Sequence, residues 1–75
     1  MGIITEAVIN NLECAIKECN TALKNIDIIE ASLHIGFRSN FANKESFDDL
    51  TEAKNRIVKV KEECLKKLQK EKEYE

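Results

Sequence analysis

Apolar residues recur through the first half of the chain in alternating steps of four and three residues. They lie at Val8, Leu12, Ala15, Cys19, Ala22, Ile26, Ile29 and Leu33. An α-helix has about 3.6 residues per turn, so these steps keep the apolar side chains on one side of a helix. The pattern predicts one amphipathic helix over residues 3–35, with the hydroxyl of Thr5 as a candidate cap in its first turn.

This apolar side is wider than a coiled-coil seam. Ile9, Ile16 and Leu23 each follow a member of the stripe and add a third row of apolar positions. A single neighbouring helix cannot cover a face of that width. Asn25 and Asp27 allow the alternative of two shorter helices, but the unbroken seven-residue spacing favours one continuous helix.

A loop over residues 36–45 follows, and a second helix is expected over residues 46–72. Gly36 comes just after the last periodic residue and is expected to end the first helix in a left-handed conformation. Ser46 is the expected cap of the second helix, with Asp49 completing a capping box. The second apolar stripe consists of Phe47, Leu50, Ala53, Ile57, Val60, Cys64 and Leu68.

The length and composition of the chain indicate how the two helices are arranged. The chain has 75 residues, no proline, two glycines and 35% charged residues, a composition typical of long helices. A core of this size rarely supplies more than about 3–5 kcal/mol by itself. We therefore predict a single all-α domain over residues 1–75, a long antiparallel helical hairpin that dimerises into a four-helix bundle. The expected dimer core consists of Leu12, Ala15, Cys19, Ala22, Ile26, Ile57 and Cys64.

The titratable residues do not form a recognisable catalytic or metal-binding motif. His34 is the sole histidine and follows Glu30 by four residues, whereas bundle metal sites use histidines and carboxylates from several helices. We therefore expect His34 to be a polar residue near the end of the first helix and not a ligand. We expect no metal, no cofactor and no enzymatic activity. The number of cysteines is odd, which predicts reduced thiols and not a set of disulfides. Glu6 places an acid near the start, where a secretory signal would be basic, so we expect a cytoplasmic protein.

The loop offers two interpretations. Phe37 and Phe41 either fold back over the end of the bundle or remain exposed to bind a partner. The candidate protein-binding residues are Phe37, Arg38, Phe41, Asp48 and Asp49. These residues favour binding to another protein as the function. We therefore expect a non-enzymatic homodimer that serves as adaptor, regulator or inhibitor of a larger protein. In composition the chain resembles accessory proteins of phages and mobile elements.

Nucleic-acid binding is the alternative function. The segment from Lys54 to Lys70 carries seven basic and two acidic residues. Its candidate phosphate contacts are Lys59, Lys66 and Lys70. A solvated helix face explains the same residues. In general plan a dimeric helical hairpin resembles the plasmid RNA-binding Rop family, but no motif is shared and architecture does not transfer function. The net charge of −2 favours neither nucleic acid nor a membrane surface, and a structural assembly module is a third class.

Overall fold

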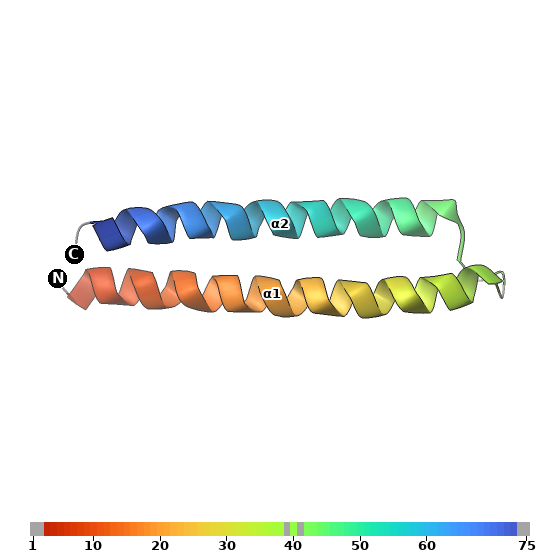
Figure 1. Ribbon diagram of the computed structural model, residues 1–75, viewed down its shortest axis with the longest axis horizontal. Helices are drawn as coiled ribbons and strands as arrows, with labels where there is room; N and C mark the ends of the chain where they lie inside the picture. Colours follow the sequence, from red (N-terminus) through yellow and green to blue (C-terminus); the bar gives the residue numbers. More distant parts are fainter. Residues whose placement is uncertain (1–2, 39, 41, 74–75) are drawn as a thin grey trace.

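The computed structural model consists of two long helices packed side by side (Figure 1). It describes residues 3–38, 40 and 42–73, and the side chains of residues 5–38, 40 and 42–73. Helix α1 covers Ile3–Arg38 and helix α2 covers Lys44–Glu73, so the chain is an all-α antiparallel hairpin, as predicted. The rod measures 56 × 14 × 12 Å.

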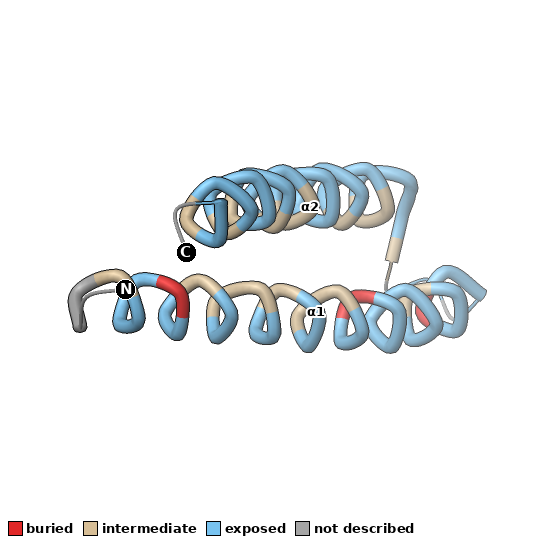
Figure 2. Tube along the Cα trace, turned by 60° about the vertical axis from the view of Figure 1, so that its left-hand side comes forward, coloured by how far each residue is buried: buried red, intermediate tan, exposed pale blue. Residues whose placement is uncertain are grey.

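The apolar sides of the two helices face each other along the rod. Figure 2 shows the buried and half-buried stretches of α1 on the side toward α2, and those of α2 on the side toward α1. Among the described side chains, Ile9 and Ile26 are the only buried hydrophobic ones, with 8% and 6% of their surface exposed. At the open end, Lys72 Nζ lies 3.7 Å from Glu13 Oε1 and marks the antiparallel register.

Helix α1 is continuous past Asn25, which confirms the prediction of one helix. Its end differs from the prediction, because α1 runs through Gly36 to Arg38 and Gly36 is buried without a positive φ. Asn40 adopts the left-handed conformation instead, with φ of 65°, and its N–H donates to the carbonyl of Phe37. Asparagine tolerates this conformation better than most residues other than glycine, because its short polar side chain is able to hydrogen-bond to nearby backbone.

Gly36 has another role at the turn. The N–H of Ala42 donates to the Gly36 carbonyl at 3.2 Å, so the chain returns directly over this residue. A buried residue without a side chain permits that close approach.

Helix α2 begins at Lys44 and not at Ser46, so the predicted cap is corrected. Asn43 is the cap: its Oδ1 accepts from the N–H of Ser46 at 3.1 Å, while its own N–H donates to Ser46 Oγ at 3.2 Å. Ser46 therefore fills the third helical position of the capping box, the place that had been expected for Asp49. The reciprocal pair gives the Asn43 N–H an acceptor and adds a side-chain acceptor to the Ser46 N–H, which also donates to the Asn43 carbonyl at 3.0 Å.

Replacing Asn43 with Ala should lower the free energy of unfolding by about 1 kcal/mol, because the cap acceptor is lost. Urea unfolding followed by circular dichroism measures the change. Asn55→Ala is the matched control, since Asn55 is exposed in the middle of α2 and Ala is the better helix former there. Equal loss in both variants would contradict the capping role of Asn43.

Candidate interaction surfaces

A groove runs between the helices along the middle of one side of the rod. Its lining consists of Glu18, Cys19 and Ala22 from α1 and Arg56, Ile57 and Val60 from α2, around a hollow of 320 Å³. Small side chains at Cys19 and Ala22 leave this space open between the helices. Val60 is 49% exposed, so apolar surface in the groove faces solvent.

The apolar surface continues along the rod on both sides of this hollow. Seven-residue spacing places Val8, Ala15, Ala22 and Ile29 in one row of α1, and Ala53 and Val60 in one row of α2. We call these two rows the groove side. Val8 and Ile29 are 37% and 46% exposed, so the groove side is incompletely covered at both ends as well as in its middle.

The residues expected in the dimer core lie within the hairpin's own interhelical face. Ile26 is buried, and the other six, Leu12, Ala15, Cys19, Ala22, Ile57 and Cys64, are half-buried. One partner helix covers each of them partly, because two cylinders in contact leave both flanks of the contact open. Their place in a dimer stays a prediction.

A second surface lies at the loop end, where aromatic rings from both helices meet. The ring of Phe47 lies 4.9 Å from that of His34 and 6.1 Å, edge-on, from that of Phe37. Together with Lys44 these residues border a hollow of 450 Å³. Phe37 keeps 56% of its surface exposed, so it covers the end of the hairpin only in part. Phe41 lies outside the described residues.

The other candidate binding residues do not join this aromatic cluster. Arg38, Asp48 and Asp49 are exposed, and none of them lines the hollow. The sequence reasoning missed His34 and Phe47 as members of the cluster. The three-residue step from His34 to Phe37 was a usable signal, since it places both rings on one side of a helix.

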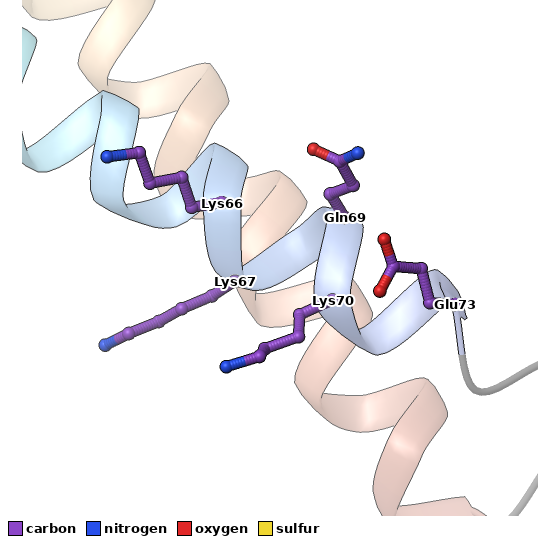
Figure 3. A pocket seen from close by; sticks show the side chains of 5 residues that line it. All are labelled: Lys66, Lys67, Gln69, Lys70 and Glu73. Atoms are coloured by element: carbon purple, nitrogen blue, oxygen red, sulfur yellow. The ribbon is translucent and has the colours of Figure 1, made fainter.

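The basic segment of α2 presents exposed lysines near the end of the rod. Lys66, Lys67 and Lys70 line an open hollow of 360 Å³ with Gln69 and Glu73, and Figure 3 shows the side chains of Lys67 and Lys70 extended away from α2. Lys59 is also exposed.

Acidic residues interrupt this basic surface. Glu63 follows Lys59 by four residues and precedes Lys66 by three, so it lies between them on the same helix face. Glu73 similarly follows Lys70 by three residues. The arrangement does not form a continuous row of cations along which a phosphate backbone would bind.

Candidate metal ligands do not cluster among the described side chains. Over residues 5–38, 40 and 42–73, no cluster of three or more His, Cys, Asp or Glu could hold a metal ion. All three cysteines are free thiols, with Cys14 exposed and Cys19 and Cys64 half-buried. Neither helix, within the part that the structure describes, has an apolar stretch long enough to cross a membrane. No protein-family model, curated protein or solved structure matches this chain.

Proposed function

We propose that the protein is a non-enzymatic interaction module, in which two hairpins form a homodimeric four-helix bundle that acts as adaptor, regulator or inhibitor of a larger protein. The thin core of the single hairpin supports this proposal most directly. No described side chain is fully buried, while Val8, Ile29 and Val60 remain 37–49% exposed on the groove side. Burial of a Val or Ile side chain stabilises a fold by about 1.5–3 kcal/mol when complete, so a second copy has apolar surface to cover.

The groove side suits a second copy of the same chain. Small residues at Ala15, Ala22 and Ala53 let two helical backbones approach closely. In a two-fold interface each residue meets its counterpart reciprocally, so Glu18 of one copy can face Arg56 of the other on both sides of the axis. Arg56 also pairs with Glu52 on its own helix, so in the isologous arrangement Glu18 of the other copy would be its second carboxylate partner.

The loop end supplies a surface for the larger protein. His34 and Phe37 lie in other rows of α1 than Ala22 and Ile29. A dimer formed through the groove side therefore leaves the aromatic cluster of His34, Phe37 and Phe47 free. Aromatic residues and Arg are enriched at protein interfaces, and Phe37 and Arg38 supply one of each. We propose Phe37 and Arg38 as contacts, with Phe41, Asp48 and Asp49 as further candidates.

Sedimentation equilibrium over a wide concentration range tests the dimer. We expect a mass of twice the 8.6 kDa of the chain, falling toward the single-chain value on strong dilution. A helical, cooperatively folded species of 8.6 kDa at every concentration would contradict the four-helix bundle. Species larger than a dimer would favour the assembly-module class instead.

A further inference from the structure

Helix α1 carries apolar residues on the face that points away from α2. Ile28 and Ile35 follow the inward-facing Ile26 and Leu33 by two residues, a rotation of about 200° around the helix. Ile28 and Ile35 are accordingly 60% and 64% exposed, more than any other large hydrophobic residue described. With their exposed neighbours in steps of three, four and seven they form an outer stripe, which comprises Thr21, Lys24, Asn25, Ile28, Ala31, Ser32, Ile35 and Arg38.

Helix α2 provides an internal comparison. Its outward face, half a turn from the half-buried Leu50 and Ile57, contains only polar residues in the same spacing: Asp48, Glu52, Asn55, Lys59, Glu62 and Lys66. A helix face that only meets water is expected to look like this. The outward face of α1 departs from that expectation at Ile28, Ala31 and Ile35, and contiguous exposed apolar positions mark interaction sites.

The charged residues of the outer stripe restrict which kind of molecule can bind there. The outer stripe contains two cationic residues, Lys24 and Arg38, at the two ends of its apolar part, and no acidic one. A second copy does not fit, because antiparallel packing of two outer stripes about Ala31 would bring Lys24 of one copy against Arg38 of the other. The polar outward face of α2 offers no apolar residues either. The net charge of −2 opposes adsorption to an anionic bilayer.

We propose that the outer stripe of α1 binds an amphipathic helix of a partner protein. The apolar seam of that helix covers Ile28 and Ile35, and its carboxylates pair with Lys24 and Arg38. These two cations are 14 residues apart, about 21 Å along the helix, so the partner needs about four turns with an acid near each end. This inference deepens the proposed function and rests on it in one respect, that the protein acts by binding another protein.

Three synthetic helical peptides with one common leucine seam and different flanking residues test the charge requirement. The flanking residues are Glu, Gln or Lys at the positions facing Lys24 and Arg38, and binding to the full chain is measured by fluorescence anisotropy. We expect the Glu peptide to bind roughly five- to tenfold more tightly than the Gln peptide, the sum of two exposed ion pairs. The Lys peptide should bind most weakly.

Two sets of variants test the residues. Combined Ile28→Ser and Ile35→Ser should weaken the Glu peptide roughly tenfold or more, because the apolar contact is lost, while circular dichroism remains that of the native hairpin. Combined Lys24→Glu and Arg38→Glu should reverse the preference toward the Lys peptide. Lys59→Glu with Lys66→Glu makes the same charge change on α2 and should leave the order of the three peptides unchanged.

Several outcomes would overturn the proposal. These are absence of binding, equal affinity for all three peptides, or sedimentation of the chain with phosphatidylglycerol vesicles that depends on Ile28 and Ile35. Loss of the doubled mass in the Ile28→Ser, Ile35→Ser variant would assign the outer stripe to a contact between copies, and so would also overturn it. If the wild-type chain were monomeric and still bound the peptides according to charge, the proposed four-helix bundle would be wrong. The outer stripe would nevertheless be supported as a binding site.

Discussion

Replacing Ile26 with Ala should leave the hairpin largely unfolded at room temperature. Ile26 has the smallest exposed fraction of the described hydrophobic residues, 6%, and lies in the middle of the interhelical face. Truncation of a buried Ile to Ala costs about 2–5 kcal/mol, through lost burial and the cavity left behind. A core of this size supplies about 3–5 kcal/mol, so the loss is comparable with the whole stability. Urea unfolding followed by far-ultraviolet circular dichroism measures it.

Ile28→Ala is the matched control for this experiment. It makes the same chemical change two residues further along the same helix, at a side chain that is 60% exposed. Its effect on the free energy of unfolding should stay within about 0.5 kcal/mol, as for most surface substitutions. Both proteins must be compared at one chain concentration, since association contributes to apparent stability. Equal losses would mean that Ile26 does not face α2.

The second large effect is expected from Ala22→Glu in the groove. The longer side chain would fill the space that Cys19 and Ala22 leave open, and its carboxylate would lie one turn from Glu18. An unpaired charge enclosed at an interface costs about 3–5 kcal/mol, so the dissociation constant of the dimer should rise by roughly two to four orders of magnitude. Sedimentation equilibrium of wild type and variant measures this shift.

Asn20→Glu is the corresponding control, because it adds the same charge to the same helix at an exposed position outside the groove side. Its dimer should dissociate as the wild type does. If Ala22→Glu kept the wild-type mass at low concentration, a dimer would have to form through another surface, and the proposed interface would be wrong.

Which elements form could be predicted from local spacing. The steps of three and four from Val8 to Leu33 predict a helix wherever they occur, and they continue across Asn25 as the helix does. The ends of the helices were less predictable. Gly36 has the usual residue type for a helix end, but the chain closes back over its carbonyl and leaves the left-handed position to Asn40. The preference of one residue does not determine where a loop closes.

The candidate surfaces were partly visible in the sequence. The basic residues of α2 could be assigned to one helix, but the aromatic cluster requires Phe47 to come opposite His34 and Phe37, and this depends on the register between helices. Arg38, Asp48 and Asp49 were grouped with Phe37 because they lie near the loop in sequence. Nearness along the chain did not bring them to the aromatic hollow, since residues on a helix point in different directions from one position to the next.

Hydrophobic spacing therefore determines two amphipathic helices joined by a short loop and running antiparallel. It can do so because each pattern involves residues within a few helical turns of one another. The packing of α2 against α1 decides which apolar rows are covered. Ile26 and Ile28 are the same residue type two positions apart, yet one is buried and the other is mostly exposed. The difference arises because a single neighbouring helix reaches only one side of α1, and what the other side meets depends on a molecule outside this chain.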